Sequence, residues 1–328
     1  MLRNIVTGAV IALGLAAAPA KAAEEINFGI ISTEASSNLK VMFNPWLEDM
    51  QKATGLKINA FFASDYAGII EGMRFGKVQV AWYGNKSAME AVDRAEGEVF
   101  AQTIPANGEP GYYSHIIVNK DSPFQKLEDV LKCDKTLDFG IGDPNSTSGF
   151  LVPMTFVFGA KNIDPKNCFK TVRAANHEAN ALATANKLVS VAANNSENLD
   201  RLKKTNPEAL DKIRVIWTSP LIASDPLVWR KDLDAGTKKK LADFIFGYGN
   251  SGNAEADAKA KEVLKGMTWA TFKPSDNRQL LPIRQMELSK EMSKVQGDEK
   301  LSADEKNAKI EELKKKIADI ETQIGAKS

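Results

Sequence analysis

Histidine and cysteine are scarce in this sequence, with two of each among 328 residues, and this scarcity argues against a metal site. A protein-bound zinc ion usually needs three or four ligands at short, regular spacings. His177 and Glu178 begin like the helical zinc motif H-E-x-x-H, but Ala181 stands where the second histidine belongs. The sequence also has no Walker A phosphate loop. We therefore expect neither a metal ion nor a cofactor.

An excess of charge of either sign is also absent. The sequence has 43 Lys and Arg against 42 Asp and Glu, which gives a formal net charge of +1 at pH 7. Proteins that bind nucleic acids usually show a basic excess. We therefore expect no nucleic-acid partner.

Long apolar runs are confined to the N-terminus. There, Arg3 precedes an apolar stretch over 5–15, and the following small residues include Ala20-Lys21-Ala22, which fits the A-x-A cleavage pattern of a secretory signal peptide. No later stretch reaches the length of a membrane span. We expect residues 1–22 to be a signal peptide and the mature protein to be exported to the periplasm as a soluble protein.

The two cysteines, Cys133 and Cys168, lie next to predicted surface turns. An oxidising compartment allows such a pair to form a disulfide. The alternative is a pair of buried free thiols. We favour the disulfide, which would close a loop around the hydroxyl-rich motif described below.

Strand-like and helix-like segments alternate along the chain, a pattern typical of α/β folds. We predict two lobes, the first comprising 24–120 plus 226–285 and the second 121–225, followed by a helical tail over 286–328. Each lobe should have a cleft at the carboxyl ends of its strands, and two facing clefts can close on a ligand. The expected strands are 26–31, 56–62, 78–82, 112–119, 137–141, 170–173, 189–193, 214–217 and 227–230.

The run DPNSTSG over 143–149 contains three adjacent hydroxyls, Ser146, Thr147 and Ser148. It follows a predicted strand and precedes an apolar helical run, so the hydroxyls should lie at a helix start. A helix start offers free N–H groups and the positive end of the helix dipole, which together suit a tetrahedral anion. The alternative is an ordinary N-cap with a turn, because Ser, Thr, Asn and Asp all favour that position.

Other polar residues are also expected at strand ends or at the crossovers between lobes. They are Tyr66, Tyr112, His177, Glu197 and Asp225. Taken singly, each has a structural reading: a tyrosine in the core, or a helix cap. Taken together, their positions should converge on one cleft.

The tail is rich in charge, and five apolar residues recur in it at alternating spacings of three and four residues. Such a narrow seam is typical of helices that pair along their length. Two readings remain open: a homodimer contact through this helix, or a helix packed back on its own domain. The five residues are Ile310, Leu313, Ile317, Ile320 and Ile324.

Five segments resemble the phosphonate-binding periplasmic proteins of bacterial ABC importers, and in particular the 2-aminoethylphosphonate branch. The resemblance covers nearly the whole mature chain and implies a two-lobed (type II) periplasmic binding protein with two crossovers, here with a C-terminal helical extension. It further implies delivery of ligand to a membrane permease with its ATPase subunit. The segments are FGIISTE (28–34), FFASDYAGII (61–70), AWYGN (81–85), GDPNSTSG (142–149) and DPLVWR (225–230).

The resemblance also implies roles for single residues. Glu197 and Asp225 fall on the positions that hold the ligand's amine, and an ammonium in a closed cleft needs such partners. Alternatives are a binder of phosphate, phosphite, methylphosphonate or an amino acid, an enzyme acting on phosphonates, and a scaffold protein. We expect a binding protein and no catalytic residues. The implied phosphonate ligands are Tyr66, Tyr112, Ser146, Thr147, Ser148 and His177.

Overall fold

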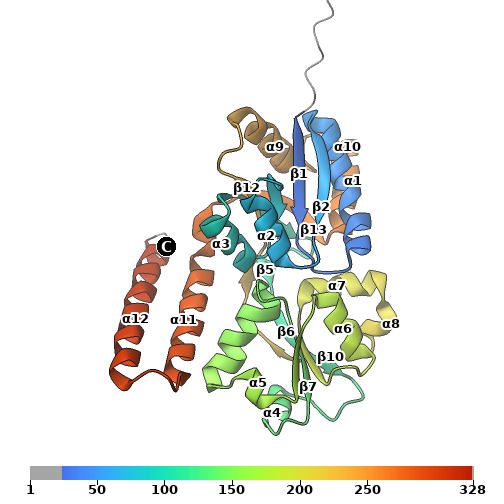
Figure 1. Ribbon diagram of the computed structural model, residues 1–328. Helices are drawn as coiled ribbons and strands as arrows, with labels where there is room; N and C mark the ends of the chain where they lie inside the picture. The colour runs from blue at the N-terminus through green and yellow to red at the C-terminus, as the bar shows by residue number, and fades with distance from the viewer. Residues whose placement is uncertain (1–23, 327–328) are drawn as a thin grey trace, which may run out of the picture.

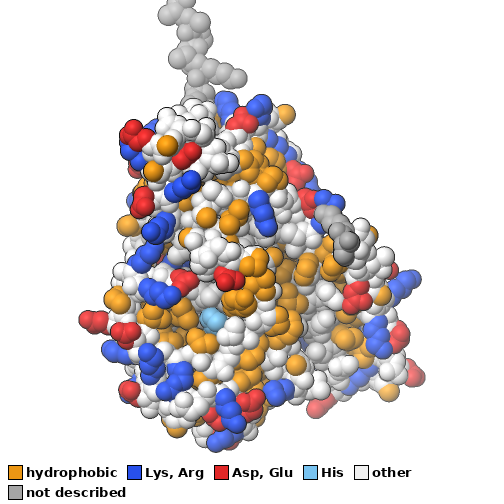
Figure 2. Space-filling view, turned by 180° about the vertical axis from the view of Figure 1, so that it is seen from behind, with side chains coloured by type: hydrophobic (Ala, Val, Ile, Leu, Met, Phe, Trp, Pro, Cys, Tyr) orange, Lys and Arg blue, Asp and Glu red, His pale blue; other side chains and the backbone are white. Residues whose placement is uncertain are grey.

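The protein, described here as a computed structural model over residues 24–326, consists of two α/β lobes with a helical hairpin alongside them (Figure 1). Residues 1–22, the expected signal peptide, lie outside the described residues. Within 24–326, every helix is too short or too polar to cross a bilayer. Seen from behind, basic and acidic side chains are intermixed on the surface (Figure 2).

The first lobe is built on a six-stranded sheet in the order β13-β4-β12-β3-β1-β2. Strands β2 and β3 run parallel to β1, whereas β12 is antiparallel to β3 and β4, and β13 is antiparallel to β4. The strands are β1 (Glu25–Ile30), β2 (Lys57–Phe62), β3 (Val80–Trp82), β4 (Gly97–Pro105), β12 (Pro226–Arg230) and β13 (Trp269–Pro274). The helices are α1 (Ser36–Thr54), α2 (Tyr66–Arg74), α3 (Asn85–Arg94), α9 (Ala235–Gly247), α10 (Ala254–Gly266) and the short η4 (Asn277–Leu280).

Helix α1 shows how the sequence builds the core of this lobe. Its buried residues Leu39, Phe43, Trp46 and Met50 recur at three- and four-residue spacings and so form one apolar face. Trp46 packs edge-on against Phe28 of β1, with ring centroids 5.3 Å apart. Burial of such a side chain contributes roughly 1.5–3 kcal/mol, which fixes the helix on the sheet.

The second lobe is built on a five-stranded sheet in the order β10-β6-β9-β7-β8. Its parallel strands are β7 (Asp138–Ile141), β8 (Thr171–Ala174) and β9 (Val191–Asn195), and antiparallel β6 (Ser114–Asn119) and β10 (Ile213–Thr218) complete it. The helices are α4 (Leu127–Val130), α5 (Pro165–Cys168), α6 (His177–Ala185), α7 (Ser196–Thr205) and α8 (Pro207–Leu210), with the π-helical and 3-10 turns η1 (Thr147–Leu151), η2 (Met154–Phe158) and η3 (Gly159–Lys161).

The two lobes are joined by a small ribbon of β5 (Gly111–Tyr112) and β11 (Ile222–Ala223). A Cβ atom on Gly111 would lie 2.0 Å from the carbonyl oxygen of Ile222, so only glycine allows this close crossing. The predicted lobe boundary at residue 120 was wrong. Strand β6 pairs with β9 and β10, so residues 114–119 belong to the second sheet, and the chain changes lobe before them.

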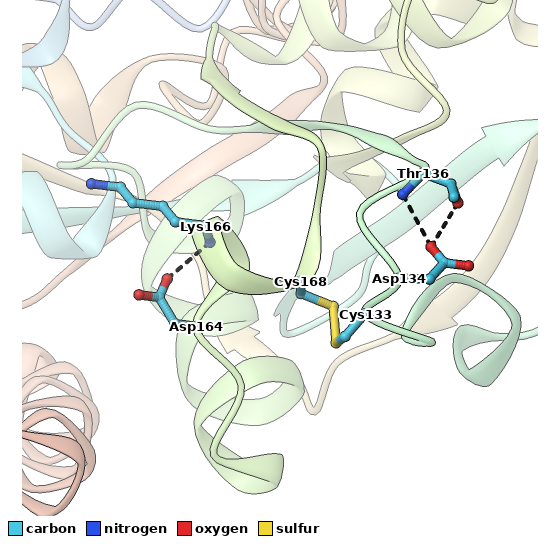
Figure 3. The surroundings of a disulfide bond; sticks show 6 residues. All are labelled: Cys133, Asp134, Thr136, Asp164, Lys166 and Cys168. Carbon is cyan, nitrogen blue, oxygen red and sulfur yellow. Dashed lines mark hydrogen bonds between the residues drawn. A yellow bond between two sulfur atoms is a disulfide. The ribbon is translucent and has the colours of Figure 1, made fainter.

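Cys133 and Cys168 form a disulfide bond rather than two free thiols (Figure 3). It ties the turn before β7 to α5 and closes a loop with a sequence separation of 35 residues. The hydroxyl-rich run lies inside that loop.

The tail folds into a hairpin of α11 (Leu281–Gly297) and α12 (Ala303–Gly325). Leu313 and Ile320 of the apolar seam are buried, and α12 packs along α11. The apolar seam thus packs against α11 of the same chain, and the structure gives no support to a homodimer contact. Helix α11 contacts both lobes, because it packs on α3 of the first and on η1 and η2 of the second.

Candidate ligand-binding pocket between the lobes

A small pocket lies between the lobes, and all eight residues predicted to bind ligand line it. They come from the carboxyl ends of parallel strands, from turns after them, and from the joining ribbon. The pocket is lined by Tyr66, Tyr112, Ser146, Thr147, Ser148, His177, Glu197 and Asp225, together with Ile31, Thr33, Gly84 and Asn195.

Five helices or helical turns begin at this pocket. Helix α2 begins at Tyr66, α6 at His177 and α7 at Ser196, while Gly84 is the N-cap of α3 and Ser146 is the N-cap of η1. Helix N-termini carry a partial positive charge and free N–H groups. Their convergence offers an anion several positive helix ends and free N–H groups, although no lysine or arginine among the described residues lines the pocket.

The three hydroxyls are held in place by hydrogen bonds of their own. Ser146 Oγ accepts from the Gly149 amide at 3.0 Å and so caps η1. Ser148 Oγ accepts from Asn195 Nδ2 at 3.0 Å, and the Ser148 carbonyl accepts from Ser114 Oγ at 2.6 Å. Both alternatives considered for this run therefore apply: Ser146 is an ordinary N-cap, and the three hydroxyls also line the pocket.

Two helices of the first lobe receive a cap from the second lobe. The Lys86 amide in the first turn of α3 donates to Thr147 Oγ1 at 2.8 Å, and the N-cap of that helix, Gly84, has no side chain to accept it. The Tyr66 amide at the start of α2 donates to Asp143 Oδ2 at 3.1 Å. These bonds exist only while the lobes are together, so they contribute to the closed arrangement seen here.

His177 is neutral in this pocket. Burial, with a contribution from the charge of Arg201, lowers the pKa of its ring to about 3. Its Nε2 lies 3.2 Å from Asn195 Nδ2 and 3.4 Å from Ser146 Oγ. Asn195 Oδ1 accepts from the Asn198 amide at 2.7 Å, which orients the Asn195 amide so that its NH2 group faces the ring. With Nε2 accepting, the neutral ring carries its hydrogen on Nδ1, which has no hydrogen-bond partner within the described residues, and donation from Nε2 to a ligand requires the other tautomer.

The two carboxylates lie in the same pocket as the hydroxyls. Burial raises the pKa of Glu197, and burial together with the charge of Glu197 raises the pKa of Asp225 well above its ordinary value. Asp225 Oδ1 has no hydrogen-bond partner among the described residues. Tyr112 and Trp82 side chains next to the Asp225 carboxylate offset part of this rise in pKa, but a buried carboxylate remains costly unless a cation neutralises it. Burial likewise raises the pKa values of Tyr66 and Tyr112, so both phenols remain hydrogen-bond donors.

Sequence reasoning missed Asn195 and Thr33 as pocket residues. Asn195 is the N-cap of α7 and is followed by the first two residues of that helix, Ser196 and Glu197. An asparagine between a strand and a helix was a signal that could have identified it. Thr33 follows β1 at its carboxyl end, which is the same signal that led to the other residues.

Comparison with known proteins places this geometry in a family. The family model described as "ABC transporter, phosphonate, periplasmic substrate-binding protein" matches residues 28–280. The phosphonates-binding periplasmic protein of Escherichia coli K12 is 54% identical over 306 residues, which cover 92% of this chain and 88% of that protein. These relatives are substrate-binding proteins of transporters and not enzymes.

Solved structures agree. A binding protein component of an ABC phosphonate transporter from Pseudomonas aeruginosa is 53% identical and superimposes with a TM-score of 0.89, covering 93% of this chain and 99% of that one. A Prochlorococcus marinus protein in complex with methylphosphonate is 20% identical, covers 80% of this chain and 97% of that one, and shares the fold with a TM-score of 0.71. The chain therefore belongs to the phosphonate-binding family of periplasmic substrate-binding proteins of ABC transporters.

Proposed function

We propose that this protein captures 2-aminoethylphosphonate in the periplasm and delivers it to the permease of its transporter. In this proposal, residues 1–22 are the signal peptide that exports it. The phosphonate group is held by the phenols of Tyr66 and Tyr112, the hydroxyls of the 146–148 run and His177. The ammonium group is held by Glu197 and Asp225.

The observation that carries the proposal is the pairing of opposite environments in one pocket. Helix N-termini and hydroxyls suit an oxyanion, whereas Glu197 and Asp225 are buried carboxylates with raised pKa values. A ligand with a phosphonate at one end and an ammonium at the other satisfies both. Its ammonium would supply the partner that Asp225 Oδ1 lacks within the described residues.

Binding would follow the two-lobed arrangement. Ligand first contacts one lobe, and closure then brings the donors of the other lobe into place. The ligand shifts the population toward the closed form because only that form makes both sets of contacts.

The second candidate ligand is a phosphorus oxyanion without an amine, such as methylphosphonate, phosphite or phosphate. The hydroxyls and helix N-termini would serve it equally well. The two carboxyl groups do not favour it, because such a ligand brings no cation that would offset the burial of their charged forms. An enzyme acting on phosphonates is disfavoured by the family relationship reported above.

Calorimetric titration of ligand-stripped protein with 2-aminoethylphosphonate, methylphosphonate and phosphate tests the proposal. Wild-type protein should bind the aminated ligand much more tightly than the other two. Glu197→Gln and Asp225→Asn should each weaken 2-aminoethylphosphonate by roughly 10- to 100-fold, because a charge-assisted hydrogen bond is worth about 1.5–3 kcal/mol. Both variants should leave methylphosphonate affinity unchanged or improved.

Glu208→Gln, an exposed carboxylate of α8, is the matched control and should bind all three ligands as wild type does. Equal loss for 2-aminoethylphosphonate and methylphosphonate in the Glu197 and Asp225 variants would assign these carboxylates a structural role. A wild-type preference for phosphate would overturn the proposed ligand while leaving the family assignment intact.

A further inference from the structure

A buried ion pair joins the two lobes outside the pocket lining. Glu34, in the loop after β1 of the first lobe, pairs with Arg201 of α7 in the second lobe. The side chains are only 3% and 5% exposed. Glu34 Oε1 also accepts from Asn198 Nδ2 at 3.3 Å. Neither Glu34 nor Arg201 is among the residues that line the pocket.

A second carboxylate also joins the lobes, but it comes from the second lobe and is bound by donors of the first. Glu178, in the first turn of α6 in the second lobe, reaches the end of the same loop and the first turn of α1 in the first lobe. Its Oε2 accepts from the Ala35 amide at 2.8 Å, and its Oε1 accepts from Asn38 Nδ2 at 2.7 Å. Each lobe thus offers one carboxylate that is bound by donors of the other lobe. Figure 1 shows α7 at the edge of the second lobe that faces the first, with α6 next to it.

We infer that Glu34 with Arg201, and Glu178 with its partners on the first lobe, form an inter-lobe latch that stabilises the closed protein whichever phosphonate is bound. Glu34, Arg201 and Glu178 are positioning residues in this inference, because they act on the lobes and not on the ligand. The inference uses lobe closure and does not depend on the amine recognition proposed above.

The burial of the pair explains why it should respond to closure. With the lobes apart, Glu34 and Arg201 can each be hydrated, and neither needs the other. With the lobes together, Glu34 is the carboxylate that hydrogen-bonds the buried Arg201, whose Nη2 has no hydrogen-bond partner within 24–326, and Glu197 is a second negative charge that acts on this cation. Removing one member of a buried pair leaves the other uncompensated, and that cost arises only on closing.

Glu34→Gln is the decisive variant. It should raise the Kd of 2-aminoethylphosphonate and of methylphosphonate by the same factor, about 10- to 100-fold, and mainly by faster dissociation. Small-angle X-ray scattering at matched ligand concentration should show a larger fraction of open protein. The melting temperature of ligand-free protein should change little, because the open form does not use the pair.

Glu178→Gln gives an independent measurement, on a group that is only half-buried. It should raise both Kd values by a smaller common factor, about 3- to 10-fold. Asp121→Asn is the matched control, because it removes an exposed ion pair with Lys187 inside the second lobe and should leave both Kd values unchanged.

Unchanged Kd values in folded Glu34→Gln and Glu178→Gln would overturn the inference. So would a loss confined to the aminated ligand, which would assign these residues to amine recognition. A lower melting temperature of ligand-free Glu34→Gln with unchanged affinity would make the pair structural. Failure of the wild-type protein to prefer 2-aminoethylphosphonate would refute the proposed ligand. The equal rise in Kd that Glu34→Gln should cause for both ligands would still be expected.

Discussion

Thr147→Val offers the sharpest test of how closure and binding are connected. The substitution keeps the shape of the side chain and removes one hydroxyl. That hydroxyl accepts the Lys86 amide of α3 across the lobes at 2.8 Å, and Thr147 is 1% exposed. In the closed valine variant, the Lys86 amide would be buried with no acceptor.

The expected magnitude follows from this lost acceptor. A buried N–H left unpaired costs about 1–3 kcal/mol, and loss of a helix cap costs about 0.5–2 kcal/mol by itself. The penalty applies to the closed form, since water can reach the amide when the lobes separate. We therefore expect the Kd for any phosphonate to rise by roughly 5- to 150-fold, before adding the hydroxyl's proposed contact with ligand.

Calorimetric titration and thermal unfolding of the same samples separate the outcomes. Thr147→Ser, which keeps the hydroxyl, should bind nearly as wild type does. Thr155→Val is the matched control, because its hydroxyl donates to the Leu151 carbonyl at 2.9 Å within its own segment. Wild-type affinity in Thr147→Val would refute the reasoning, as would an affinity loss fully matched by a loss of stability in the ligand-free protein.

Three further outcomes are expected. The pKa of His177 is lowered to about 3 in the folded protein, whereas in the unfolded chain it is about 6.5. Between these pH values the unfolded chain binds one more proton than the folded protein. The free energy of unfolding should therefore fall as the pH drops from about 6.5 toward 3. In His177→Gln, urea unfolding should show a slope against pH that is smaller by up to about 1.4 kcal/mol per pH unit, and identical slopes would contradict burial of a neutral ring. The double variant Cys133→Ala/Cys168→Ala should lose roughly 3–4 kcal/mol of unfolding free energy in denaturant titrations, given the 35-residue separation, and a matching fall in ligand affinity would show that the disulfide shapes the pocket. Leu313→Ala should destabilise the hairpin by about 2–5 kcal/mol in hydrogen-exchange measurements and leave Kd unchanged. Ile324 is 37% exposed, so Ile324→Ala should change neither the stability of the hairpin nor Kd.

The sequence predicted the parallel strands because their signals are local. Strands β4 and β13 were not predicted. One begins with Gly97 and the other ends with Pro274, and both residue types are unfavourable in strands. The helix expected after the hydroxyl run is instead made of π-helical turns on either side of Pro153, which supplies no N–H for the regular pattern.

The pocket residues could be predicted because they follow strands whose carboxyl ends meet at one place. The contacts between lobes could not be predicted in the same way. Lys86 and Thr147 are 61 residues apart, and Glu34 and Arg201 are 167 apart, so their pairing depends on how two separate sheets are placed. A glycine N-cap at Gly84 gives no hint that a threonine from elsewhere completes the helix.

Helix α11 lies beyond the residues that the family model matches and contacts both lobes. The family match ends at residue 280, and α11 begins at Leu281. Its Glu287 pairs with Lys86 of the first lobe at 3.4 Å, and its Lys290 lies 5.6 Å from the ring of Phe150 in the second. Any opening of the lobes must slide this helix against one of them. We therefore expect substitutions at the lobe-facing contacts of α11 to change how far and how fast the lobes open, although no pocket residue is altered.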